Sequence, residues 1–173
     1  MCHSFPMQHD NLDPIWEKLR NSMDEPAPRI VVKAFVSLGG DQADPIYCTS
    51  YTDGQERIWR VIAIAGNALI KIRATGPEYW DAQSELQFGH DTKASLDEAS
   101  ISLIPSSVAA LRVLNALSYS RNVSPWVTSW EVAMTAGETV QLPVPADLKS
   151  AHRSQHEPAE AVALAIRAAL MDG

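Results

Sequence analysis

A predicted β-hairpin between Arg57 and Thr75 constrains the fold more than any other part of the sequence. Two runs rich in β-branched and aliphatic residues flank the dipeptide Gly66-Asn67, and this spacing is typical of a two-residue turn. In that register one face of the hairpin carries only apolar cross-strand pairs, namely Ala65 with Ala68, Ala63 with Ile70, Val61 with Ile72 and Trp59 with Ala74. Successive side chains of a strand point to opposite faces, so we expect this face to pack against the protein core.

The other face of the hairpin becomes cationic away from the turn. Its cross-strand pairs, from the turn outwards, are Ile64 with Leu69, Ile62 with Lys71, and Arg60 with Arg73. Like charges directly opposite each other on a sheet are unfavourable by roughly 0.2–1 kcal/mol. We therefore expect an anion between Arg60 and Arg73: a carboxylate of this chain, an acidic group of a partner, or a phosphate. The candidate carboxylates of the chain are Glu56 and Glu131.

A second turn extends this sheet towards the N-terminus. Residues 46–52 are predicted to form a strand, and Asp53-Gly54 is a strong signal for a hairpin. A turn at this dipeptide sets Tyr47 opposite Arg60 and keeps the apolar residues of the new strand on the core face. The resulting three-stranded meander has Tyr47, Arg60 and Arg73 in one cross-strand row, where the Tyr47 ring could stack on a guanidinium.

The rest of the chain predicts further strands and a helix at each end. Alternating apolar residues predict strands within 30–38, 99–103 and 111–119, followed by a hairpin over 130–142 with Thr135-Ala136-Gly137 as its loop. A short N-terminal helix begins with Asp13 as its cap. An amphipathic helix covers 157–171 behind the capping-box pair Ser154 and Glu157, and it has to bury its apolar stripe against a sheet.

Residues 76–97 form the least regular segment of the sequence. The aromatic residues Tyr79, Trp80 and Phe88 are scattered among acidic and amide side chains without a helical or strand period. The segment is too long for an ordinary connection, so we expect a lid-like insertion, a short helix or a partner-binding loop. Together with exposed sheet edges, the three aromatic residues predict a docking surface for a protein partner or for a second copy of the chain.

Four segments define the order of the predicted elements: the hairpin over 59–73, the crossover over 101–113, the hairpin over 130–143 and the helix over 157–170. In this order the chain resembles pleckstrin-homology-like and GRAM-like barrels of the small bacterial type. The resemblance implies a mainly β fold with two antiparallel sheets forming a split barrel, a short N-terminal helix and a C-terminal capping helix. It divides the chain into an N-terminal lead with a short helix, residues 1–28, and a barrel domain, residues 29–173, with an insertion at 76–97.

The resemblance also implies binding rather than catalysis. Lipid-binding members of the family carry a Lys/Arg-x-Arg pattern on an early strand, and Lys71-Ile72-Arg73 is similar to that fragment. The fragment adds Lys71 to the cationic row. An anionic small ligand or a phospholipid headgroup, bound by Tyr47, Arg60, Lys71 and Arg73, is therefore the alternative to a protein partner.

The composition restricts the partners and the location. The 173 residues are 46% hydrophobic and 20% charged, as in ordinary globular domains, and the formal net charge is −7. An acidic chain is not expected to bind nucleic acid, because that affinity comes from neutralising phosphates with Lys and Arg. No apolar run is long enough for stable membrane insertion, and the N-terminus has no signal pattern. Two cysteines, Cys2 and Cys48, favour reduced thiols and a cytoplasmic location.

Histidines supply the candidates for catalysis or metal binding. His152 and His156 are four residues apart, but Pro158 places the predicted helix start after them, so we expect solvated side chains. His90 lies near two serines in the sequence, and a hydrolase-like enzyme using His90 is a second alternative. No catalytic residue, metal site or cofactor is predicted, because the spacing shows no convergent acid, base and nucleophile.

Taken together, the sequence predicts a non-catalytic cytoplasmic binding module whose partner is another protein or a second copy of the chain. The predicted binding residues are Tyr47, Arg60, Lys71, Arg73, Tyr79, Trp80 and Phe88. The anionic-ligand binder and then the hydrolase-like enzyme follow as alternatives.

Overall fold

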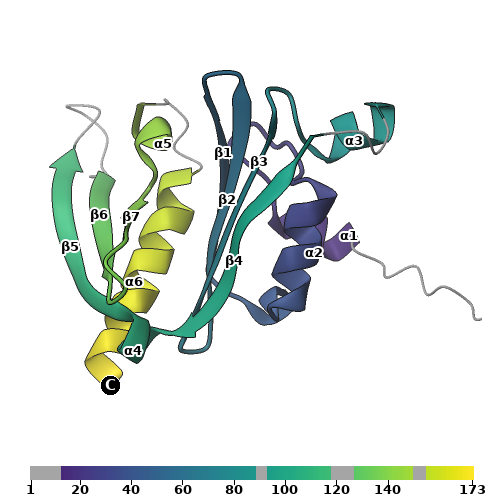
Figure 1. Ribbon diagram of the computed structural model, residues 1–173. Helices are drawn as coiled ribbons and strands as arrows, with labels where there is room; N and C mark the ends of the chain where they lie inside the picture. Colours follow the sequence, from purple (N-terminus) through teal and green to yellow (C-terminus); the bar gives the residue numbers. More distant parts are fainter. Residues whose placement is uncertain (1–12, 89–92, 118–126, 150–154) are drawn as a thin grey trace, which may run out of the picture.

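The computed structural model describes residues 13–88, 93–117, 127–149 and 155–173 of the chain. Within these ranges the protein is mainly β, with two antiparallel sheets that are not closed into a barrel. The helix α2 lies on one side of the larger sheet, and the C-terminal helix α6 lies between the two sheets (Figure 1). The predicted fold class is thus confirmed, with its two antiparallel sheets, short N-terminal helix and C-terminal helix. The likeness to pleckstrin-homology-like domains stays a prediction.

The elements have the following bounds. The four-stranded sheet contains, in spatial order, β1 (Ile46–Asp53), β2 (Glu56–Ala65), β3 (Ala68–Pro77) and β4 (Ser95–Leu103). The three-stranded sheet contains β5 (Val108–Leu117), β6 (Val127–Met134) and β7 (Thr139–Leu142). The helices are α1 (Asp13–Lys18), α2 (Arg29–Ser37), the 3-10 turn η1 (Gly40–Gln42), α3 (Ala82–Phe88), α4 (Ile104–Ser107), α5 (Pro145–Lys149) and α6 (His156–Asp172).

Two of the three predicted hairpins, at Gly66-Asn67 and at Gly137, have the predicted register. In the central hairpin Ala65 pairs with Ala68, and every later pair between β2 and β3 follows from it. Gly66 has a φ of 63°, a left-handed value that glycine adopts without strain. In the second hairpin Trp130 pairs with Leu142, as the three-residue loop predicts. Here Gly137 takes the left-handed position, with a φ of 97°.

The predicted register between β1 and β2 is wrong by two residues. Asp53 pairs with Glu56, so the turn residues are Gly54 and Gln55 rather than Asp53 and Gly54. Gly54 has a φ of 64°, and a turn whose first residue needs a positive φ favours glycine there. A shift of two residues leaves every side chain on its predicted face but changes its partner. Tyr47 therefore lies opposite Ile62, and Arg60 lies opposite Thr49.

The predicted strand within 30–38 is also wrong, because this segment forms the helix α2. Its fully buried residues are Val31, Val32 and Phe35, a spacing that matches one side of a helix. The alternation of Ile30, Val32, Ala34 and Val36 that suggested a strand leaves out Val31 and Phe35. Tertiary packing on the sheet thus decides the conformation of a segment whose β-branched content also suits a strand.

The helix α2 covers the apolar face of the central hairpin, as expected for a core face. Together they form a buried cluster that we call the α2 core, which includes Phe35, Cys48, Trp59, Val61, Ile70, Ile72 and Trp80. The side chain of Phe35 fills the space above Gly40, where a Cβ atom would come within 2.5 Å of its ring. The opening hairpin thus supplies one complete wall of a core.

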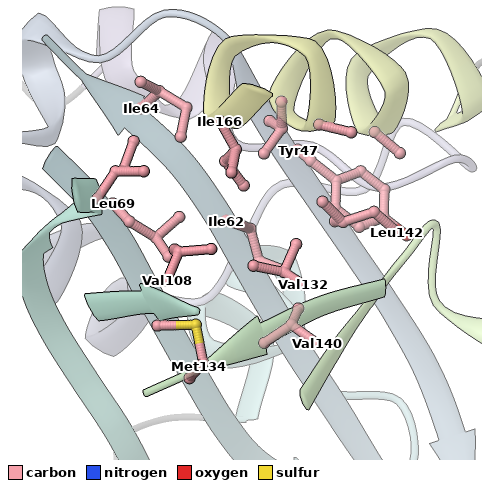
Figure 2. Close-up of a cluster of buried hydrophobic side chains, with 14 of the residues drawn as sticks. Tyr47, Ile62, Ile64, Leu69, Val108, Val132, Met134, Val140, Leu142 and Ile166 are labelled. Atoms are coloured by element: carbon pink, nitrogen blue, oxygen red, sulfur yellow. The ribbon is translucent and has the colours of Figure 1, made fainter. Parts of the chain in front are cut away.

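The opposite face of the sheet is buried as well, which the sequence did not predict. Near the turn of the central hairpin, Ile62, Ile64 and Leu69 pack against the three-stranded sheet and α6 (Figure 2). We call this second cluster the intersheet core. Helix α6 contributes Val162 and Ile166 from its predicted apolar stripe. Only the end of this face that is far from the turn keeps its cationic character.

Residues 76–97 divide between regular elements. β3 continues to Pro77, α3 covers Ala82–Phe88, and β4 begins at Ser95. A short helix, one of the three expected alternatives, is therefore present. Trp80 is fully buried against Gly76, where a Cβ atom would lie 2.3 Å from its ring. Its carbonyl accepts a hydrogen bond from Trp59 Nε1 at 2.8 Å, so this part of the segment is fixed to the sheet.

Candidate functional site

The predicted cross-strand row of Tyr47, Arg60 and Arg73 does not exist, because the register between β1 and β2 differs. Tyr47 is fully buried, donates its hydroxyl hydrogen to Asp147 and accepts the backbone N–H of Val144 at 3.0 Å. Burial raises the pKa of the Tyr47 phenol, and the negative charge of Asp147 raises it further. Tyr47 therefore connects β1 to α5 inside the protein and is not placed to contact a ligand.

Lys71 is buried in an ion-pair cluster that joins the two sheets. Its ammonium lies 2.8 Å from Glu98 on β4 and also pairs with Glu138 in the turn between β6 and β7. The Lys71 side chain is only 8% exposed. An intramolecular carboxylate, one of the expected alternatives for the cationic face, thus neutralises Lys71. The similarity of Lys71-Ile72-Arg73 to a lipid-binding fragment gains no support from this placement.

Arg60 and Arg73 lie opposite each other, as predicted, at the far end of the same face. The carboxylate nearest to Arg73 belongs to Asp97, 3.9 Å from Nε. A hydrogen bond from the Thr75 hydroxyl at 2.5 Å is the main reason that the pKa of Asp97 lies below its usual value. Glu131, one of the two candidate carboxylates for this role, pairs instead with Arg112 at 2.8 Å.

The three aromatic residues of the predicted docking surface do not share one environment. Trp80 is fully buried, and its Nε1 donates to Glu85 at 3.0 Å. Tyr79 is 78% exposed. Phe88 is the last residue of α3, and its side chain lies outside the described part of the structure. The prediction of Trp80 as a contact residue is wrong because its ring fills the α2 core.

Of the histidines discussed above, His156 is the one that the structure describes, and it is not solvated. It is the first residue of α6 and is 8% exposed, with Nε2 lying 3.1 Å from the backbone oxygen of Asp147. The prediction of a solvated side chain is wrong because α6 begins at His156 rather than after it. His90 and His152 lie outside the described residues. Within the described ranges, no group of three or more His, Cys, Asp or Glu side chains could hold a metal ion.

A groove lies between α1, α2 and α3, and we call it the helical groove. Its volume is about 790 Å³, which is within the range of ligand-binding clefts. The lining residues are Trp16, Glu17, Arg20, Pro26, Arg29, Ile30, Lys33, Trp80, Ala82, Gln83, Glu85, Leu86 and Ala94. The lining thus combines apolar side chains with charged groups of both signs.

The carboxylates of the helical groove are already satisfied by this chain. Glu17 pairs with Arg20 at 3.6 Å. Glu85 accepts the backbone N–H of Arg29 at 3.0 Å with one oxygen and Trp80 Nε1 with the other. The exposed side chains of Arg29 and Lys33 form no ion pair with any residue in the described ranges. With three cations and two carboxylates, the lining therefore carries a net charge of +1 in a chain of net charge −7.

The wall of the groove formed by α1 and the following connection is attached to the sheet by a polar cluster, which we call the polar clamp. Asn21 Nδ2 donates to Ser50 Oγ at 2.8 Å, and the buried Arg57 donates to the same oxygen at 2.7 Å. Arg57 also pairs with Glu25. Within the wall itself, Trp16 Nε1 donates to the Ala27 carbonyl at 2.8 Å. These bonds hold the groove in a defined shape before any partner arrives.

Sequence reasoning did not find the helical groove, because it assigned residues 30–38 to a strand. A strand would place Arg29 and Lys33, four residues apart, on the same face as each other but opposite to Ile30. A helix instead brings Lys33 next to both Arg29 and Ile30, since residues three and four apart are neighbours on its surface. The signal that could have found the groove is the helical spacing of Val31, Val32 and Phe35.

Known proteins give no guide to the site. The chain matches no protein-family model, no curated protein and no solved structure in the comparisons. Among the residues that the structure describes, no helix combines the length and the hydropathy that crossing a bilayer requires.

Proposed function

We propose that the protein is a non-catalytic binding module that holds an acidic peptide segment of a partner protein in the helical groove. The observation that carries this proposal is the position of Arg29 and Lys33 beside the apolar lining of Trp16, Ile30 and Leu86. Arg29 and Lys33 are both cations on α2 that have no ion-pair partner among the described residues. An acidic side chain of the partner would pair with the cations, and an apolar side chain would cover the adjacent ring and aliphatic groups.

A peptide fits this groove better than a small ligand does. Sites for small molecules bury most of the ligand surface, whereas the rim of this groove is open, with Leu86 81% exposed and Arg29 and Lys33 exposed. A peptide needs to bury only one side, and its remaining surface can stay in water. The width across three helices also offers contacts to several successive residues of one segment.

The chemistry of the lining supports binding rather than catalysis. Among the described residues that line the groove there is no Ser, Thr, Cys or His. The described thiol, Cys48, is buried under α2, and burial raises its pKa. A thiol with a raised pKa stays protonated near neutral pH and is a poor nucleophile.

The test uses short fluorescent peptides and the full chain. One peptide has Glu and Asp residues around a central Phe or Leu, and its counterpart has Lys at the acidic positions. We expect the acidic peptide alone to bind in fluorescence anisotropy, with an affinity that falls as salt is added. The double charge reversal Arg29→Glu with Lys33→Glu should weaken binding by about tenfold or more.

The matched control carries the same change of charge at a distance from the groove. Arg112→Glu with Arg167→Glu reverses two exposed cations on β5 and α6 and should leave the affinity unchanged. Failure of the acidic peptide to bind, or equal weakening by both double variants, would refute the proposal. If citrate displaces the peptide at equal concentration of carboxylate groups, the site takes small anions, and the proposal of a peptide partner is wrong.

A further inference from the structure

The two outer edges of the four-stranded sheet differ in how they are covered. At the β1 edge the carbonyl of Cys48 accepts a hydrogen bond from the side-chain amide of Gln155 at 2.8 Å, and the amide oxygen accepts the Ser22 N–H at 2.9 Å. This amide is oriented so that both bonds are satisfied. At the opposite edge, no strand in the described ranges pairs with the outer side of β4 (Figure 1). An unpaired strand edge is a template for pairing with another strand.

The turn of the central hairpin determines which residues of β4 point their backbone groups to this open edge. A two-residue turn at Gly66-Asn67 makes the flanking residues a hydrogen-bonded pair, and bonding then alternates residue by residue across an antiparallel sheet. With the observed pairing, Ser100 and Ser102 bond to β3. The residues whose N–H and C=O groups face away from β3 are Ala99, Ile101 and Leu103.

The same three residues also present apolar side chains to solvent. Ile101 is 48% exposed, Leu103 is 55% exposed, and Ala99 is exposed beside them. Residues 99–103 contain no charge and no proline, and such groups are the usual protection of a sheet edge. By contrast β5, an edge of the other sheet, has two irregularities in its pairing that interrupt a regular ladder. The stretch 99–103 has none.

We propose that a second copy of this chain covers this edge, with β4 pairing antiparallel to β4 and Ile101 on the two-fold axis. In this register Ile101 faces its own counterpart, and Ala99 faces Leu103 in both directions. Facing residues of this type exchange two backbone hydrogen bonds. The exposed apolar side chains of both copies then meet on one side of a continuous eight-stranded sheet. A two-fold contact of this kind is self-complementary and needs no second surface.

The charges next to the edge select this register over its neighbours. Asp97 and its counterpart lie eight residues apart along the paired strands, or about 26 Å at about 3.3 Å per residue. That separation is well beyond the screening length of about 8 Å at physiological salt. A register centred on Ala99 halves this distance to about 13 Å and sets the charged Asp97 opposite the apolar Ile101 of the other copy, which the Ile101-centred register avoids. A register centred on Leu103 sets Ile101 opposite Pro105, which has no N–H to donate.

The size of the contact indicates a concentration-dependent dimer. Five residues from each copy bury less surface than a standard stable interface. The Leu103 carbonyl already accepts a hydrogen bond from Ser107 Oγ at 2.7 Å. This backbone acceptor would therefore be shared between Ser107 and the partner strand. We therefore expect dissociation in the micromolar range rather than a permanent dimer.

The test is sedimentation velocity on the full chain between about 1 and about 300 µM, concentrations that bracket a micromolar dissociation constant. The wild type should change from monomer to dimer within this range. Ile101→Lys should remain monomeric throughout, because a lysine at the centre of each strand sets two like charges opposite each other. Circular dichroism checks that the variant is folded, which we expect since Ile101 is about half exposed.

A matched variant on β5 and a disulfide-trapping experiment show whether the dimer forms through the β4 edge or through the β5 edge. Val113→Lys changes an equally exposed residue of β5, 58% exposed, and should dimerise like the wild type. In a Cys2→Ser background, Ile101→Cys should form a disulfide-linked dimer on mild oxidation, and Val113→Cys should not. The proposal is overturned by a wild type that stays monomeric, by a dimer that survives Ile101→Lys, or by trapping through residue 113 instead of residue 101.

Discussion

The two faces of the four-stranded sheet are buried by different means. On one face α2 packs mainly apolar side chains against the central hairpin, with Phe35 and Val61 among them. On the other face the intersheet core also contains directional polar contacts: Tyr47 binds Asp147, and Lys71 joins Glu98 and Glu138. Helix α2 precedes the sheet closely in the chain, whereas the second sheet is attached through contacts between distant residues. Apolar packing dominates on the first face, where the directional contacts are the Trp59–Trp80 bond and the polar clamp, whereas buried charged and hydrogen-bonded groups select the position of the second sheet.

The largest expected effect concerns the apolar face. Phe35→Ala removes a fully buried ring from the α2 core and should lower the free energy of unfolding by about 3–5 kcal/mol. Urea unfolding followed by circular dichroism measures this loss. A decrease below about 1 kcal/mol would show that α2 adds little to this face, since surface substitutions typically cost that little.

The polar contacts of the other face predict a smaller effect. Lys71→Met should lower the free energy of unfolding by about 2 kcal/mol, less than for a fully buried ion pair. The reason is that the side chains of Glu98 and Glu138 are 29% and 48% exposed and can regain water. Adding Glu98→Gln and Glu138→Gln to Lys71→Met should restore most of the lost free energy of unfolding, because no unpaired carboxylate is then left at the contact. If the triple variant is as unstable as Lys71→Met, the ion-pair cluster is not the cause.

Stability at alkaline pH depends on both faces of the sheet, because Cys48 and Tyr47 are neighbours in the chain whose side chains lie in opposite cores. Burial raises the folded-state pKa of both groups above that in the unfolded chain. The stability that each protonated group contributes is therefore complete below the pKa of that group in the unfolded chain. It is lost as the pH rises, starting near pH 9 for the thiol and near pH 10 for the phenol. Above these values, ionisation of each group should lower the free energy of unfolding by up to about 1.4 kcal/mol per pH unit.

Urea unfolding between pH 8 and 11 checks this dependence, with the variants Cys48→Ala and Tyr47→Phe. Cys48→Ala should delay the loss of stability to the range of the phenol, and Tyr47→Phe should reduce its slope above pH 10. Identical pH profiles for the wild type and both variants would mean that neither group stays protonated in the folded state.

Turn chemistry explains which parts of the fold the sequence predicted. The registers at Gly66-Asn67 and at Gly137 are local properties of a few residues, so they could be derived without the rest of the chain. The register at Gly54 depends on whether glycine comes first or second in the turn, and the dipeptide rule chose the wrong position. A two-residue error of this kind keeps the faces correct and changes the partners, which is why the Tyr47–Arg60 pair failed.

The candidate site was beyond the reach of local patterns. The helical groove requires α1, α2 and α3 to meet, and these helices are brought together by the sheet and the polar clamp. Of its lining residues the sequence singled out only Trp80, and for a surface role that its burial contradicts. Likewise, the partners of Lys71 come from one other strand and from a turn of the other sheet, so charge pattern alone could not show that Lys71 was neutralised.

The order in which the two cores can form follows from the residues they need. All fully buried members of the α2 core lie between Leu19 and Trp80, whereas the intersheet core includes residues as late as Ile166. During synthesis on the ribosome, the first core can therefore close while the second half of the chain is still being made. Until α6 emerges, Ile62 and Leu69 remain uncovered on the other face. The nascent protein thus passes through a half-covered sheet, the stage at which it is most exposed to aggregation and to capture by chaperones.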